Sequence, residues 1–168
     1  MTDTAPTDDR LRELADQLGH RCMAAGVRIG TAESCTGGLV GHACTEIAGS
    51  SSWFRGGVIA YADDVKEAVL GVATEAIVAH GAVSAQVAVA MAEGARRLLG
   101  VDLAVSVTGI AGPGGGTDAK PVGLTYVAVA DVDGHDVRRF VWPHDRSGDK
   151  RASAEAALLL LLERLGRA

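Results

Sequence analysis

The stretch V-R-I-G-T-A-E-S-C-T-G-G, residues 27–38, decides the fold class of this chain. Residues 27–32 form a short β-prone run, and the apolar pattern of residues 39–47 predicts a helix after the two glycines. Such a strand-to-helix turn leaves backbone N–H groups unpaired, and these bind anions or polarised oxygens. Ligands of open α/β sheets also gather at the carboxyl ends of strands. A capped helix without a ligand is the simpler interpretation. The candidate ligand residues are Glu33, Ser34, Thr36 and Gly37.

Helical and β-prone patterns continue on both sides of this turn, which predicts an α/β protein. We expect helices at residues 8–25, 39–47, 63–70, 73–80, 85–99 and 147–165, and strands at residues 27–32, 58–61, 101–108, 122–130 and 136–142. Asp133-Gly134 predicts a hairpin between the last two strands. At 168 residues the chain is most simply one domain, spanning residues 8–168, with a disordered tail at residues 1–7.

Composition and charge exclude several classes of protein. The net charge is -5, whereas binding to a phosphate backbone needs clustered positive charge, so a nucleic-acid partner is not expected. The N-terminus lacks the pattern of a signal peptide, and the longest apolar run is too short to span a bilayer, so no membrane partner is expected. Cys22, Cys35 and Cys44 have no metal-type spacing and fit the reduced thiols of a cytoplasmic protein.

A second candidate stretch is G-S-S-S-W-F-R-G-G-V-I-A-Y-A-D-D-V-K, residues 49–66. Lys66 falls in the first turn of a predicted helix, where the macrodipole favours the neutral amine. Such an amine can act as general base toward a serine hydroxyl, and Ser50–Ser52 lie in the same stretch. Asp63 and Asp64 favour the ammonium form instead, and spacing alone does not settle the contest. A plain serine-rich turn beside a solvated lysine is the commoner meaning of this pattern.

Residues 109–117, G-I-A-G-P-G-G-G-T, form the strongest loop signal of the chain. Six of the nine are Gly or Pro, a composition that lets the backbone approach a ligand closely. The loop lacks the Gly-Lys-Ser/Thr ending of a P-loop and precedes a strand, so we interpret it as a ligand-cradling loop without ATP hydrolysis. Arg146, at the start of the last helix, could reach a phosphate or carboxylate, or could simply be solvated.

Four motifs together carry a resemblance to a known family: residues 31–38, residues 49–61 with Lys66, residues 80–84 (H-G-A-V-S) and residues 106–116. From about residue 8 to its end, the chain resembles the C-terminal domain family of competence/damage-inducible protein A, the nicotinamide-nucleotide amidohydrolases. The resemblance implies a three-layer α/β/α fold with a mixed sheet, assembled as a homodimer. It implies hydrolysis of nicotinamide mononucleotide to nicotinate mononucleotide and ammonia, with no cofactor and no metal. The molybdopterin-binding-like domain of two-domain relatives is not seen, so the chain resembles the stand-alone form.

The resemblance also assigns roles to residues. It places the nucleophile at Ser51 and the base at Lys66, with Tyr61 and Ser34 in support. Backbone N–H groups of residues 34–38 or 50–52 would form the oxyanion hole. Because Ser52 stands where relatives often have Ala, Ser50 and Ser52 remain alternatives, and the H-D-R sequence before the last helix differs from a common G-D-R. The residues expected to hold the nucleotide are Thr108, Gly109, Ala111, Gly112 and Arg146.

Two alternatives stay open. Cys35 lies at a predicted helix N-terminus, an environment that lowers the pKa of a thiol, and could be the nucleophile in place of serine. The chain could also be a non-catalytic nucleotide-binding module that regulates a partner.

Overall fold

The computed structural model describes residues 4–167. Its helices are α1 (Asp8–Ala25), α2 (Leu39–Thr45), α3 (Asp63–Leu70), α4 (Thr74–His80), α5 (Ala85–Leu99) and α6 (Arg146–Leu165), with a short 3-10 helix η1 (Ser50–Ser52). Its strands are β1 (Ile29–Glu33), β2 (Phe54–Ile59), β3 (Leu103–Gly109), β4 (Leu124–Ala130) and β5 (His135–Val141). None of these helices is long and apolar enough to cross a membrane, over the residues that the structure describes.

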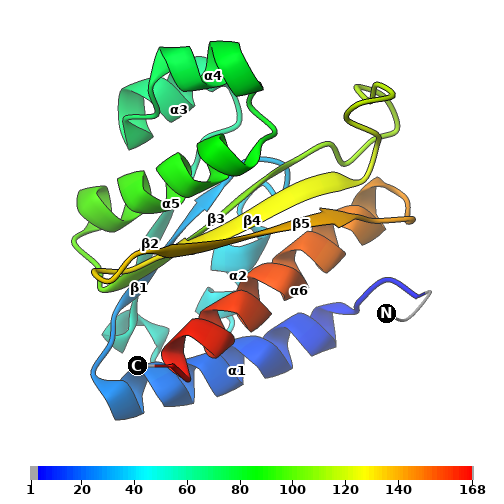
Figure 1. Cartoon of the computed structure of the whole chain (residues 1–168). Helices are drawn as coiled ribbons and strands as arrows, with labels where there is room; N and C mark the ends of the chain where they lie inside the picture. Colours follow the sequence, from blue (N-terminus) through cyan, green and yellow to red (C-terminus); the bar gives the residue numbers. More distant parts are fainter. Residues whose placement is uncertain (1–3, 168) are drawn as a thin grey trace.

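The five strands form one mixed sheet in the order β2-β1-β3-β4-β5. β1 pairs in parallel with both β2 and β3, while β4 and β5 add two antiparallel strands on one side. In Figure 1, α1, α2 and α6 cover one face of the sheet, and α3, α4 and α5 lie on the other. The predicted three-layer α/β/α fold with a mixed sheet is confirmed.

Apolar residues are buried on both faces of the sheet, as expected for parallel strands covered by helices. On the face of α1 and α6, Leu14 and Leu158 pack in a cluster with Val105. On the face of α5, Met91 belongs to a second cluster with small residues such as Ala104. These two layers fix β1 and β3 in the centre of the molecule, where their carboxyl ends are held rigidly.

The structure refines two element boundaries. β2 begins at Phe54, four residues before the β-prone run at residues 58–61. Its two glycines allow this pairing, because a Cβ on Gly57 would lie only 2.2 Å from Thr31 Oγ1 on β1. The predicted hairpin joins β4 to β5, and Asp131 Oδ1 accepts hydrogen bonds from the N–H groups of Asp133 and Gly134.

The segment before α1 was predicted to be disordered over residues 1–7. Residues 1–3 lie outside the described residues. Nearer the helix, the Pro6 carbonyl accepts a hydrogen bond from Arg151 Nε of α6 (2.8 Å), and the Thr7 hydroxyl caps α1 by accepting from the Arg10 N–H.

Candidate active site

A polar cavity of about 270 Å³ lies at the carboxyl ends of β1 and β3. Five segments meet around it: the turn after β1, the start of α3, the loop before α5, the glycine-rich loop after β3 and the first residue of α6. The volume is near the lower end of those found for small-molecule sites. The predicted site residues that line it are Ser34, Tyr61, Lys66, Thr108, Gly109, Ala111, Gly112 and Arg146.

Lys66 is almost completely buried, with 1% of its surface exposed. Its Nζ donates hydrogen bonds to the Tyr61 carbonyl and to Asp63 Oδ1, both at 3.1 Å. An ammonium has three donors, so one N–H has no acceptor among the described residues and is available to the cavity. The contact with Asp63 fixes the amine in place. Asp63, which we had considered only as a local charge, is thus part of the site.

Ser34 follows β1 directly and lines the same cavity as Lys66. Its backbone is held on both sides, since its N–H donates to the Val107 carbonyl of β3 (2.9 Å) and its carbonyl accepts from the Gly37 N–H (3.0 Å). No hydrogen bond of its hydroxyl is found within residues 4–167. A serine with a fixed backbone and an unused hydroxyl therefore lines the same small cavity as a buried amine.

The turn after β1 does not offer the anion site that we predicted. Glu33 is buried, and its carboxylate accepts hydrogen bonds from the N–H groups of Gly38, Val40 and Gly41 at 2.8–3.1 Å. It therefore fills the N-terminus of α2 with a negative charge of the protein itself. Glu33 thus has a structural role at the start of α2, and its predicted binding of substrate stays a prediction.

Two further residues of this turn lie outside the cavity lining. Thr36 is 1% exposed, and its Oγ1 is buried with no partner among the described residues. Gly37 has a φ of +65°, which a glycine adopts without strain, so its part is to let the chain turn. Neither residue lines the cavity, so a part of Thr36 or Gly37 in substrate binding stays a prediction.

The backbone of the same turn still provides donors. The N–H groups of Cys35 and Thr36 lie beside the Cys35 sulfur, and no oxygen acceptor is found for them in the described part of the chain. They follow Ser34 directly. Backbone donors next to a nucleophile are the usual form of an oxyanion hole.

Ser51 lies at the other end of the sheet. It belongs to η1, which precedes β2, and β2 runs parallel to β1 with Phe54 beside Ile29 and Ile59 beside Glu33. Ser51 is therefore separated from the end of β2 by a six-residue strand, about 20 Å long. Within one chain, the structure does not bring Ser51 together with Lys66, and the role of Ser51 as nucleophile stays a prediction. The same holds for Ser50 and Ser52.

Arg146 connects the two sides of the cavity mouth. Its Nη1 donates to the Gly112 carbonyl (2.7 Å) and its Nη2 to the Tyr61 hydroxyl (3.1 Å). Thr108 Oγ1 donates to the Ala82 carbonyl (2.9 Å), which joins β3 to the loop before α5. The glycine-rich loop thus lines the cavity as predicted, although Gly114 and Gly115 line it too and were not singled out.

Cys35 lines the cavity but is a poor nucleophile. Burial, together with a smaller effect of the nearby Glu33 carboxylate, raises the pKa of its thiol to about 12. The helix N-terminus that was expected to lower this pKa is already neutralised by Glu33. The thiol stays protonated at neutral pH, which argues against the cysteine alternative.

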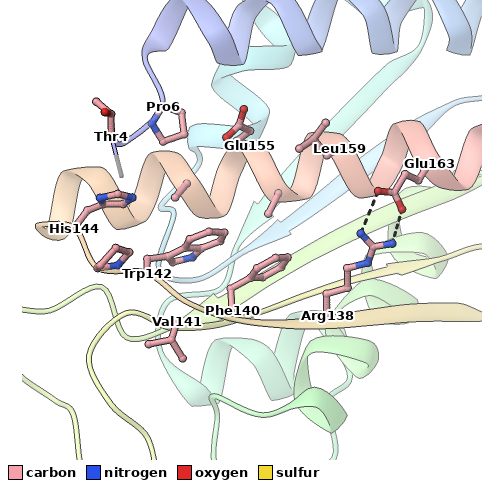
Figure 2. A pocket seen from close by; sticks show the side chains of 13 residues that line it. Thr4, Pro6, Arg138, Phe140, Val141, Trp142, His144, Glu155, Leu159 and Glu163 are labelled. Atoms are coloured by element: carbon pink, nitrogen blue, oxygen red, sulfur yellow. Dashed lines mark hydrogen bonds and ion pairs between the residues drawn. The ribbon is translucent and has the colours of Figure 1, made fainter. Parts of the chain in front are cut away.

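A larger cavity of about 430 Å³ lies elsewhere, between β5 and α6. Figure 2 shows Phe140 and Trp142 in this cavity, with Arg138 paired to Glu163 at one end. The two rings stack at 4.7 Å between centroids. This cavity shares no lining residue with the first one, and it has neither a buried amine nor a serine beside it.

The fold and the first cavity define an α/β protein whose polar site combines a serine, a lysine and a glycine-rich loop at the carboxyl ends of parallel strands. The chain belongs to the CinA C-terminal domain family, whose model matches residues 11–165.

Relatives with solved structures share this fold. The competence/damage inducible protein CihA from Agrobacterium tumefaciens is 40% identical, with a TM-score of 0.90 over 99% of both chains. A CinA superfamily protein from Klebsiella pneumoniae is 31% identical, with a TM-score of 0.91 over 94% of this chain and 99% of that one.

Curated relatives differ in length. A CinA-like protein from Salinibacter ruber is 50% identical over 84% of this chain, but the chain spans only about a third (34%) of it. The nicotinamide-nucleotide amidohydrolase PncC from Escherichia coli strain K12 is 44% identical over 92% of this chain and 94% of its own length.

Proposed function

We propose that this chain hydrolyses the carboxamide of nicotinamide mononucleotide, giving nicotinate mononucleotide and ammonia, a reaction of pyridine nucleotide recycling. The observation that carries the proposal is the cavity that Ser34 and the buried Lys66 line together with Tyr61 and Arg146. The name of the Escherichia coli relative, similar over almost its whole length, supports the substrate.

The groups around the cavity suggest the mechanism. Ser34 is the nucleophile, a role that the sequence had suggested for Ser51. Lys66 first releases one ammonium proton to water; Ser34 Oγ then attacks the carboxamide carbon while the neutral amine takes the hydroxyl proton. The amine then gives this proton to the departing nitrogen, which leaves as ammonia, and an acyl-enzyme remains. Water, activated by the same amine, attacks the ester carbon and releases the acid together with the serine.

The negative charge that develops on the carboxamide oxygen needs donors. The N–H groups of Cys35 and Thr36 are available next to Ser34 for this purpose. Fixed backbone donors act without reorganisation, and each contributes on the order of 10²–10³-fold in similar enzymes. Tyr61, whose hydroxyl contacts Arg146, lies at the mouth and can relay protons or orient the ring.

The remaining groups of the cavity hold the nucleotide. Thr108 and the backbone of residues 109–112 face the ribose, and Arg146 exchanges its bonds to Tyr61 and Gly112 for the phosphate. No step requires a cofactor. A homodimer, expected from the family, remains a prediction for a sizing measurement.

The direct test is to incubate the purified chain with nicotinamide mononucleotide and to measure ammonia and nicotinate mononucleotide. The proposal predicts both products in equal amounts. Binding of the nucleotide without ammonia release would contradict it and would favour the regulatory module instead.

A further inference from the structure

The phosphate of a nucleotide needs a binding site near the cavity mouth. The helix N-termini, which often bind phosphate, are already occupied by carboxylates of the protein. The helices that start there carry their own carboxylates: Glu33 caps α2, Asp145 Oδ1 accepts from the Gly148 N–H at the start of α6, and the first turn of α3 contains Asp63 and Asp64. Because a phosphate would have to displace these carboxylates, the helix N-termini do not form the phosphate site. Side-chain cations must supply it.

Few cations near the cavity are free for this task. Lys66 is paired with Asp63, and Lys120 Nζ donates to the His80 carbonyl at the outer end of the glycine-rich loop. Arg146 contacts only neutral oxygens, those of Gly112 and Tyr61. It has no carboxylate partner within residues 4–167.

Lys150 is a second cation close to the cavity. It lies four residues after Arg146 on α6, so both side chains share one face of the helix. A Cβ on Gly37 would lie 3.7 Å from Lys150 Nζ, which places the ammonium over the turn that begins at Ser34. No ion pair or hydrogen bond of Lys150 is found in the described chain.

The positive charge of Lys150 also acts on Cys35, a residue of the cavity lining. Burial dominates the pKa of the Cys35 thiol and raises it, while the positive charge of Lys150 acts in the opposite direction. Cys35 lines the cavity, so this charge acts from directly outside the lining. Arg146 thus lines the cavity and Lys150 lies over the adjoining turn, and neither has a carboxylate partner within residues 4–167 of a chain of net charge -5.

We propose that Lys150 binds the phosphate of the substrate together with Arg146 and makes the enzyme select a mononucleotide over the corresponding nucleoside. This rests on the proposed function for the identity of the substrate. Two cations one helical turn apart match the two negative charges of a phosphate monoester near neutral pH. The reacting carboxamide then points inward to Ser34, because the phosphate is held at the rim.

The test compares Lys150→Gln with the wild type on nicotinamide mononucleotide and on nicotinamide riboside, which lacks the phosphate. Losing a charge-assisted hydrogen bond should lower kcat/KM for the nucleotide by about tenfold or more, through KM with little change in kcat. The riboside should react equally well with both proteins. Lys150→Arg, which keeps the charge, should restore most of the loss.

Arg151→Gln is the matched control. Arg151 is the next residue on α6, but its Nε donates to the Pro6 carbonyl, away from the cavity. This variant loses the same charge and should keep the kinetics of the wild type. An equal loss in Lys150→Gln and Arg151→Gln, an equal loss on both substrates, or no loss at all would overturn the role of Lys150.

Equilibrium binding separates this inference from the proposed function. If the wild type binds nicotinamide mononucleotide but releases no ammonia, the proposed function fails. The ratio of the Kd values of nucleotide and riboside in Lys150→Gln still decides the role of Lys150, with a ratio unchanged from the wild type contradicting it. If the wild type binds neither compound, both proposals are overturned.

Discussion

The fold places two serine-bearing segments of this chain at opposite ends of the parallel strands. Ser34 stands at the carboxyl end of β1, where the neighbouring parallel strand β3 also ends and a cavity forms. Ser51 stands at the amino end of β2, in a short 3-10 turn where the Ser52 hydroxyl donates to the Gly49 carbonyl. Ser51 is closer to Lys66 along the chain, but β2 carries Lys66 away from it. Strand direction, more than sequence distance, decides which hydroxyl can meet the amine.

The largest effect should come from exchanging the two serines. Ser34→Ala should reduce kcat for ammonia release by about 10⁴-fold or more, because the attacking oxygen is lost. Ser51→Ala should leave kcat nearly unchanged, because its hydroxyl is about 20 Å from the cavity. Coupled-enzyme ammonia assays on both variants would measure this. A loss of ammonia release confined to Ser51→Ala would contradict this expectation. It would indicate that Ser51 reaches the cavity of a second copy of the chain.

The second-largest effect on kcat should come from changing Lys66. Lys66→Met should lower kcat by about 10²–10⁴-fold, since the general base is removed while an apolar chain of similar length fills the space. Asp63→Asn removes the carboxylate that holds the Lys66 amine in place, so this variant should also lower kcat. An unchanged kcat of Asp63→Asn would contradict this role of Asp63.

A Glu33 variant tests whether the hydrogen bonds to the Glu33 carboxylate stabilise the turn that carries Ser34. Glu33→Gln should lower the free energy of unfolding by about 2 kcal/mol, because a neutral amide cannot accept from three N–H groups as a carboxylate does. Urea denaturation would measure it. Glu46→Gln, at the exposed far end of α2, is the matched control and should have little effect. Unchanged stability of Glu33→Gln together with a loss of nucleotide binding would support the original prediction for Glu33.

The smallest effect concerns Cys35, next to Ser34. Its thiol has a pKa of about 12 in the folded chain and about 8.5 in an unfolded one. Because the folded-state value is raised, the contribution to stability is complete below about pH 8.5 and is lost as the pH rises toward 12. Stability should therefore fall between pH 8 and pH 10 in reducing buffer. Cys35→Ala should keep its activity and show a smaller fall, whereas inactivity of a folded Cys35→Ala would support the cysteine alternative.

Local patterns predicted most of the fold. The strand-turn-helix of residues 27–47, the hairpin at Asp133-Gly134 and the glycine-rich loop are each encoded by a few neighbouring residues, and the structure contains all three. The order of the strands depends on long-range pairing, which spacing does not reveal. For this reason the sequence could not tell which end of β2 would share the cavity with Lys66.

The differences between prediction and structure at the site have physical causes too. A carboxylate in a strand-to-helix turn can bind a ligand or cap the helix, and Glu33 caps because the backbone of residues 38–41 wraps around it. A thiol at a helix N-terminus can be activated or buried, and the burial of Cys35 outweighs the dipole. Asp63 and Lys150 are ordinary charges in sequence, and only the folded chain shows that one holds Lys66 and the other lies over the Ser34 turn.

The most direct measurement is a crystal structure of Lys66→Met with nicotinamide mononucleotide bound, since this variant should retain the substrate. We expect the carboxamide carbon to lie about 3–3.5 Å from Ser34 Oγ, with its oxygen toward the N–H groups of Cys35 and Thr36. A carboxamide placed against Ser50–Ser52, of the same chain or of a second copy, would contradict it.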